Sequence, residues 1–146
     1  MSTQTEMLYT IYETSFAAFL NNNVLSVAIM GSIKEGTNAQ RVIIKTYNFN
    51  IVTGEEVKIG DILSKENRDI DTTAVNKKIN AEVKKAAEEA ESVSQTGYEV
   101  FKRNVEDTMY NVANVTNFIQ GPQGELYIIY AYGNTNNTYE MDVIEV

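Results

Sequence analysis

The sequence predicts an α+β fold, in which an antiparallel β-sheet of about five strands is packed by one long amphipathic helix and a shorter N-terminal helix. Three observations predict this class. Ile and Val number fourteen each, and together with nine Tyr they suit a pleated, half-buried surface. Several short segments alternate apolar and polar residues, whereas one long segment keeps a helical period. The length of 146 residues suits a single domain over residues 1–146.

Residues 1–23 are predicted to form the N-terminal helix. Its apolar positions recur at three- and four-residue spacing, namely Leu8, Ile11, Tyr12, Phe16, Phe19 and Leu20. The run Asn21-Asn22-Asn23 is expected to end it. Docking of this helix on the domain's own sheet is favoured over partner binding, because most amphipathic helices face their own core. The segment is too short to cross a bilayer, and no Lys or Arg precedes it as in a signal peptide.

Two strands are predicted next, over residues 24–33 and 40–52, and the short connection between them favours antiparallel pairing. Each strand alternates in polarity. The apolar faces carry Leu25, Val27, Ile29 and Ile33 in the first strand and Ile43, Tyr47, Phe49 and Ile51 in the second. A tight turn at Thr53-Gly54 is expected to lead into a short third strand, residues 55–59.

The long helix is predicted to begin at Asp71 and to stop near Gly97. Its apolar side carries Val75, Ile79, Val83, Ala86, Ala87 and Ala90. Residues 98–115 fit strand, helix and irregular structure in different parts. A turn at residues 121–124 predicts a hairpin of strands 116–120 and 125–132, the second of which is apolar enough to be a central strand. A last strand is expected over residues 139–146, with Met141 and Val143 on one face.

Composition excludes several kinds of chemistry. The chain has no His and no Cys, so it has no imidazole base, no thiolate nucleophile, no disulfide and no His- or Cys-ligated metal. The formal charge of −8 argues against a nucleic-acid partner. The sequence Asp69-Ile70-Asp71 resembles the start of a calcium loop, but Ala74 and Asn80 stand where that loop needs Gly and Glu. Helix capping by Asp71 is favoured, and we expect no metal and no cofactor.

The negative charge is concentrated towards the C-terminus. Residues 34–103 are neutral, the first 33 residues carry −2, and the last 43 carry −6. This end also holds a Tyr- and Asn-rich segment, and both residue types suit recognition surfaces. The candidate partner surface comprises Tyr127, Tyr132, Asn134, Asn136, Asn137, Tyr139, Glu140 and Asp142. Two alternatives remain open: solubility alone as the role of the charge, and packing within the sheet as the role of Tyr130 and Tyr132.

Two blocks of the sequence resemble a known family. Residues 47–63 (YNFNIVTGEEVKIGDIL) and residues 117–119 with 124–130 (NFI and GELYIIY) are similar to two blocks of the extracytoplasmic domain-of-unknown-function family found at the C-terminus of the anti-sigma-V factor RsiV. The resemblance covers residues 24–146. Residues 130–134 and 139–142 resemble the clostridial cell-surface branch, whose members accompany copper-amine-oxidase-like stalk domains.

The resemblance implies an α+β domain outside the cytoplasm, without enzyme activity, and with its export signal upstream of Met1. It implies a binding or sensor module of a cell-surface or wall-associated protein of Gram-positive bacteria. The implied partner is a cationic protein such as lysozyme, or a wall glycan such as peptidoglycan. A structural spacer or assembly domain is the alternative. A glycan hydrolase built on carboxylates such as Glu140 and Asp142 ranks third, because the spacing of such carboxylates cannot be read from sequence.

Overall fold

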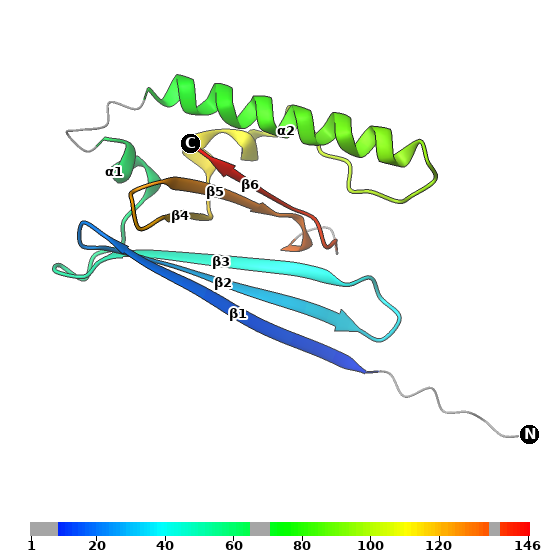
Figure 1. Cartoon of the computed structure of the whole chain (residues 1–146), viewed down its shortest axis with the longest axis horizontal. Coiled ribbons are helices and arrows are strands. Elements are labelled where there is room, and N and C mark those ends of the chain that lie inside the picture. The colour runs from blue at the N-terminus through cyan, green and yellow to red at the C-terminus, as the bar shows by residue number, and fades with distance from the viewer. Residues whose placement is uncertain (1–8, 65–70, 135–137) are drawn as a thin grey trace, which may run out of the picture.

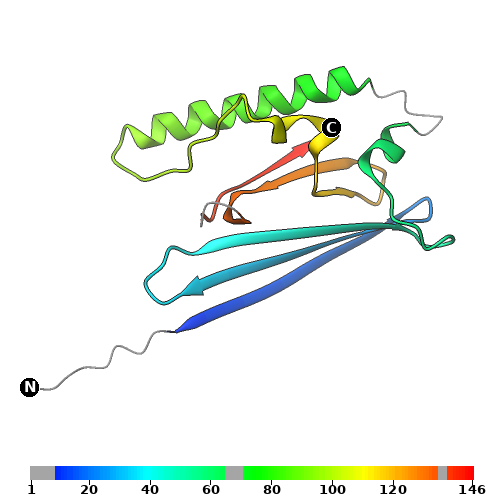
Figure 2. The ribbon, with the colours of Figure 1, turned by 180° about the vertical axis from the view of Figure 1, so that it is seen from behind.

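The computed structural model describes residues 9–64, 71–134 and 138–146, which form an α+β structure in three layers (Figure 1). A three-stranded sheet forms one outer layer, with β1 (Thr10–Asn21), β2 (Val24–Glu35) and β3 (Arg41–Asn50). A second sheet is the middle layer, with β4 (Phe118–Gln120), β5 (Leu126–Ala131) and β6 (Met141–Glu145). The helix α2 (Thr72–Ser94) covers the far side of the second sheet, as the rear view also shows (Figure 2). The α+β class is thus confirmed, but the strands are divided between two sheets.

The N-terminal helix predicted over residues 1–23 is wrong where the structure describes it, because Thr10–Asn21 is the long strand β1. β1 pairs antiparallel with β2 along its whole length, from Thr10 opposite Glu35 to Asn21 opposite Val24. Asn22 and Asn23 connect the two strands with φ angles of 43° and 66°. Asn tolerates such positive φ values, and a two-residue hairpin turn of type I′ needs them at both of its central residues. The Asn run therefore marks a hairpin turn and not the end of a helix.

The short third strand predicted at residues 55–59 is also absent. Glu56 makes a single antiparallel bridge to Phe49, and the helix α1 (Ile59–Leu63) then begins. The Asp61 carboxylate accepts a hydrogen bond from the Lys58 backbone N–H at 2.7 Å, which caps this helix. Ile59, Ile62 and Leu63 are buried. Their three- and four-residue spacing places them on one side of a helical turn, where they join the core.

The second sheet has the order β4-β5-β6, with both pairs antiparallel. The predicted hairpin at residues 121–124 is confirmed, and Gly124 takes a φ of 89° in its turn. β5 is the central strand, as its continuous apolar sequence predicts. Leu126, Ile128 and Tyr130 belong to the main core beside α2, whereas Ile129 and Ala131 pack with Ile44 of the first sheet.

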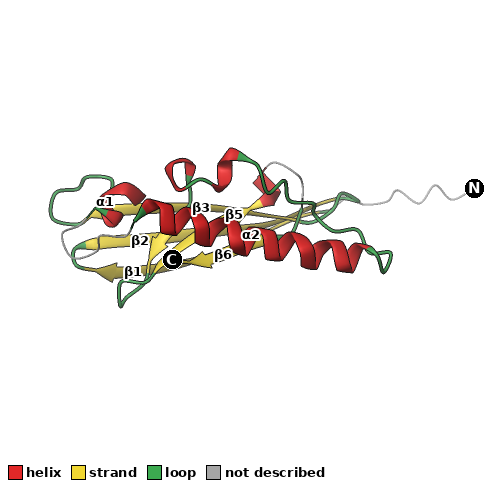
Figure 3. Cartoon of the chain, turned by 90° about the horizontal axis from the view of Figure 1, so that it is seen from above, coloured by secondary structure: helices red, strands yellow, loops and turns green. Residues whose placement is uncertain are grey.

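The helix α2 confirms the predicted long helix. The Asp71 carboxylate accepts a hydrogen bond from the Thr73 N–H at 2.9 Å, and Val75, Ile79 and Val83 are buried. The helix ends at Ser94, three residues before Gly97, which has a φ of 91°. Seen from above, it runs lengthwise along the sheets (Figure 3). Residues 98–115, left open by the sequence, are irregular apart from the single 3₁₀ turns η1 (Thr108–Tyr110) and η2 (Val112–Asn114).

Polar side chains join the two sheets. The Ser26 hydroxyl donates to Asn48 Oδ1 at 2.6 Å and accepts from the Gln120 N–H at 3.0 Å. The Asn48 amide donates to the Phe118 carbonyl at 2.9 Å, and the Phe118 N–H donates to Thr46 Oγ1 at 3.0 Å. We call these contacts of Ser26, Thr46 and Asn48 with β4 the polar seam. Because hydrogen bonds are directional, the seam fixes how β4 sits on β2 and β3.

Candidate functional site

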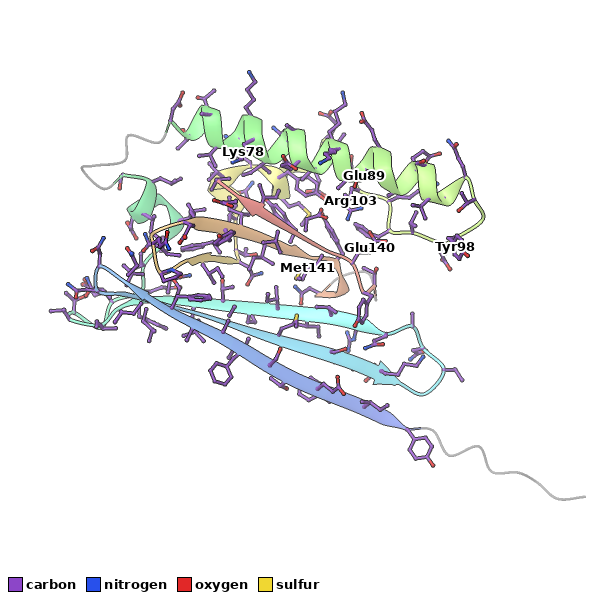
Figure 4. The ribbon with its side chains drawn as sticks, in the orientation of Figure 1. Lys78, Glu89, Tyr98, Arg103, Glu140 and Met141 are labelled. Carbon is purple, nitrogen blue, oxygen red and sulfur yellow. The ribbon has the colours of Figure 1, made fainter. Side chains whose placement is uncertain are left out.

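The two faces of the first sheet differ in polarity, and the more apolar one is turned away from the rest of the molecule. The inner face carries Ser26, Thr46 and Asn48, which form the polar seam, beside the buried apolar residues Val24, Ala28, Val42 and Ile44. The outer face carries the apolar side chains that the sequence placed together in the second and third strands. Its side chains project from the lower sheet with no described element over them (Figure 4). The alternation is as predicted, but the face that packs inside is the mixed one with the polar seam, and the face with the large apolar side chains lies outside.

The strand register arranges the outer face as five rows of three residues. From β1 across β2 to β3 the rows are Tyr12, Ile33 and Arg41; Thr14, Gly31 and Ile43; Phe16, Ile29 and Lys45; Ala18, Val27 and Tyr47; Leu20, Leu25 and Phe49. We call these positions the apolar face. Phe16 is 78% exposed and Tyr12 is 63% exposed. Contiguous apolar surface of this kind marks interaction sites in soluble proteins.

The rings on the apolar face are held in place by their neighbours. Tyr47 and Phe49 stack in parallel with their centroids 6.5 Å apart. The Tyr12 ring lies over Gly31, where an added Cβ would come within 3.1 Å of the ring. A side chain at position 31 would therefore displace Tyr12. These contacts restrict Tyr12, Tyr47 and Phe49, so a partner meets three rings that are already partly ordered.

The partner surface predicted from sequence is divided between several places. Tyr132 is buried, with 2% of its surface exposed, so it is inaccessible to a partner. Tyr127 lies half-buried at the other end of β5, opposite Glu145 of β6. Asn134 and Tyr139 are exposed, and the Asn134 amide donates to the Ala131 carbonyl at 3.1 Å. Asn136 and Asn137 fall outside the described residues.

Glu140 and Asp142 come together with Tyr132, but around an internal cation. Arg103 donates two hydrogen bonds to Asp142, each of 2.8 Å, and its Nη2 lies 3.1 Å from Glu140 Oε2. Figure 4 shows Arg103 and Glu140 close together between α2 and β6. The Arg103 side chain is only 6% exposed. Two of the six C-terminal acidic residues are therefore paired inside the protein, which sequence reasoning missed.

Aromatic rings complete this cluster, which we call the Arg103 cluster. The guanidinium lies 5.2 Å from the centre of the Tyr132 ring and 6.0 Å from the centre of the Phe101 ring, and the two rings stack with their centroids 4.2 Å apart. The Tyr132 hydroxyl donates to Asp142 at 2.5 Å and lies 2.9 Å from the Tyr110 hydroxyl. Hydrogen bonding to Asp142 raises the pKa of Arg103, and burial raises the pKa of Tyr132 and of Tyr110. Arg103 therefore stays charged and the two tyrosines stay neutral, which are the states that make these contacts.

A cavity of about 710 Å³ lies where α1, the end of β3 and η2 meet. Two polar side chains on its wall accept hydrogen bonds from backbone N–H groups. Asn76 Oδ1 accepts from the Val112 N–H at 2.7 Å, and Asp61 accepts from the Lys58 N–H. These two bonds stabilise the wall of the cavity.

The calcium loop considered for residues 69–71 reduces to one described residue, because Asp69 and Ile70 fall outside the described part. Asp71 caps α2, as favoured by the sequence. Elsewhere in residues 9–64, 71–134 and 138–146, no three acidic side chains gather as a metal site would require. Over the same ranges, no helix has both the length and the hydrophobicity to cross a bilayer.

Comparison with known proteins completes the description. No protein-family model matches the chain, and a search of curated proteins finds no significant similarity.

Proposed function

We propose that this chain is a non-enzymatic binding module that docks through the apolar face of its first sheet. The observation that carries the proposal is that this face points away from the second sheet and the rest of the molecule. A sheet is stable in water when its apolar side is buried against another layer. Here the second sheet covers the inner face, where the polar seam lies beside the buried Ile44, and the described elements leave the apolar face open. A face so built gains free energy when a partner covers it.

The acidic carboxylates give less support to the other functions considered. Glu140 and Asp142, the residues named for a glycan hydrolase, both contact Arg103. Asp142 also accepts two hydrogen bonds from Arg103 and one from the Tyr132 hydroxyl, so its oxygens are already engaged within the protein. The same pairing neutralises part of the charge that a basic protein would meet here, since Asp142 is only 13% exposed, whereas Glu140 is still 32% exposed. The resemblance to the RsiV C-terminal family supports an extracytoplasmic setting, which we retain as part of the proposal.

Binding of a fluorescent dye that responds to exposed apolar surface tests the docking face. The dilute, folded chain is expected to bind the dye, and Phe16→Glu is expected to lose most of that binding because it places a charge in the middle row. Ser15→Glu is the matched control, since Ser15 is exposed on the opposite face of β1. A folded chain that is monomeric and does not bind the dye would overturn the proposal.

Titration with lysozyme tests the partner implied by the family resemblance. Docking through the apolar face predicts binding that survives added salt and is lost in Phe16→Glu. Docking through the remaining acidic residues predicts affinity that falls steeply with salt and is unaffected by Phe16→Glu. Calorimetry at two salt concentrations separates these two modes of binding.

A further inference from the structure

We propose that the apolar face is covered by a second copy of this chain, packed face to face so that the two first sheets form a β-sandwich. The inference rests on the proposed function, because it names the partner that docks on the same face. Sheets pack in this way at about 10 Å with their strands nearly aligned. The chain would then be a symmetric dimer whose second sheets and helices lie on the two outer sides.

The area of the face suits a stable dimer. Among its four aromatic side chains, Tyr12 is 63%, Phe16 78%, Tyr47 46% and Phe49 39% exposed. If a full aromatic side chain offers about 200 Å², these four present roughly 450 Å². The aliphatic side chains of the face raise this towards the roughly 800 Å² per partner that a standard interface buries. A single monomer rarely leaves so much apolar surface open.

The charges also favour a second copy at this face. The chain carries −8, so two copies repel each other over most approaches. None of the five rows contains an acidic residue. Arg41, at the end of the first row, lies 3.6 Å from Glu35, which leaves Lys45 as the only charged residue inside the array. Glu35 continues the same side of β2 beyond the first row, opposite Thr10, and its carboxylate is paired with Arg41, so approach through the apolar face meets less acidic repulsion than other approaches.

The position of Lys45 selects the orientation of the dimer. A two-fold axis parallel to β2 exchanges β1 with β3, so each row faces the same row of the second copy. Lys45 then lies opposite Phe16 of the second copy, where an ammonium group over a ring is attractive. In the next row Tyr47 lies opposite the small Ala18. The other in-plane axis, across the strands, would place Lys45 opposite Lys45, which is repulsive. We therefore infer the axis along β2.

Ile29 and Met30 provide a matched pair of variants. They are neighbours on β2 and are exposed to 38% and 37%, but on opposite faces of the sheet. With the axis along β2, Ile29 faces itself, so Ile29→Glu brings two carboxylates together in the interface. Sedimentation equilibrium is expected to give twice the chain mass of 16.4 kDa for the native chain and for Met30→Glu. Ile29→Glu is expected to give the mass of one chain. Near-ultraviolet circular dichroism checks that each variant is folded.

Cross-linking tests the orientation, because the chain has no cysteine of its own. A mixture of the Phe16→Cys and Lys45→Cys chains is expected to form a covalent dimer with a short bis-maleimide linker. Lys45→Cys alone is expected to give little product. The opposite pattern would overturn the axis along β2.

A native chain of single mass at every concentration would overturn the dimer. If that monomer binds the apolar-surface dye and Phe16→Glu abolishes the binding, the docking face stands and its partner is a different molecule. If the monomer leaves the dye dark, both the dimer and the proposed function are overturned. Equal loss of the dimer in Ile29→Glu and Met30→Glu would also overturn the face-to-face arrangement.

Discussion

Arg103 joins parts of the chain that are far apart in the sequence. Its guanidinium contacts Asp142 and Glu140, and it lies against the rings of Phe101 and Tyr132. A buried ion pair adds little net stability over an apolar replacement, but losing one partner leaves an uncompensated charge in the interior. The cluster therefore acts mainly to fix the chain between α2 and β6.

Substitution of Arg103 tests this role. Arg103→Met is expected to lower the free energy of unfolding by about 3–5 kcal/mol, because Asp142 loses its buried cation. Lys102→Met is the control, since Lys102 is exposed and its loss should change stability by about 0.5 kcal/mol or less. Urea denaturation measures both. A small effect of Arg103→Met would show that water or a rearranged side chain replaces the guanidinium.

The buried tyrosines predict a loss of stability at alkaline pH. Burial raises the pKa of Tyr110, Tyr130 and Tyr132 above the ordinary value of 10.0. Above about pH 10 the unfolded chain releases these protons while the folded chain keeps them, so stability falls as pH rises. Each tyrosine contributes at most about 1.4 kcal/mol per pH unit. Urea midpoints at about pH 9 and about pH 11 measure the fall.

Tyr130→Phe serves as the control for this pH dependence. The Tyr130 hydroxyl is buried and makes no hydrogen bond within the described residues, so its removal is expected to leave neutral-pH stability unchanged or slightly raised. The fall in the free energy of unfolding per pH unit above about pH 10 is expected to become smaller by the contribution of one tyrosine. An unchanged slope would assign the pH dependence to other groups.

At the scale of elements, the contact between β4 and the first sheet is made by side chains bonded to backbone. Ser26 is fully buried, and its hydroxyl serves both Asn48 and the Gln120 N–H. Ser26→Ala is expected to cost about 2–4 kcal/mol, because it leaves two buried polar groups without that partner. Ser15→Ala, at an exposed position of β1, is the control. Equal stability of the two variants in chemical denaturation would contradict a stabilising role for the polar seam.

The elements also show where sequence reasoning succeeded. The helix α2, the central strand β5 and the hairpin at residues 121–124 were predicted, because each has a strong local signal. β1 was predicted as a helix because the spacing of its large apolar residues fits both the repeat of a helix and the repeat of a strand. Tyr12, Phe16 and Leu20 stand four residues apart, which suits one side of a helix and equally one side of a strand. The Asn22-Asn23 turn decides between them, and its conformation is visible only in the structure.

At the scale of the whole molecule, the layer order could not be predicted. Alternation shows that Leu25, Val27 and Ile29 share a face, but not which face the second sheet will cover. The predicted partner surface had the same limitation, because Arg103 lies 39 residues before Asp142 and nothing local links them. Long-range packing, and not local preference, decided both the open face and the internal use of Glu140 and Asp142.

The order of the first three strands has a consequence for biosynthesis. β1, β2 and β3 are consecutive and joined by short turns, so their pairing closes only small loops and is fast. β4, β5 and β6 lie in the last third of the chain, and a ribosome supplies them later. During that interval the inner face of the nascent sheet, which includes Val24 and Ile44 of the later core, is not yet covered by the second sheet, and exposed apolar surface of this kind makes folding intermediates prone to aggregate. We therefore expect the yield of folded protein to depend on how quickly synthesis reaches β6.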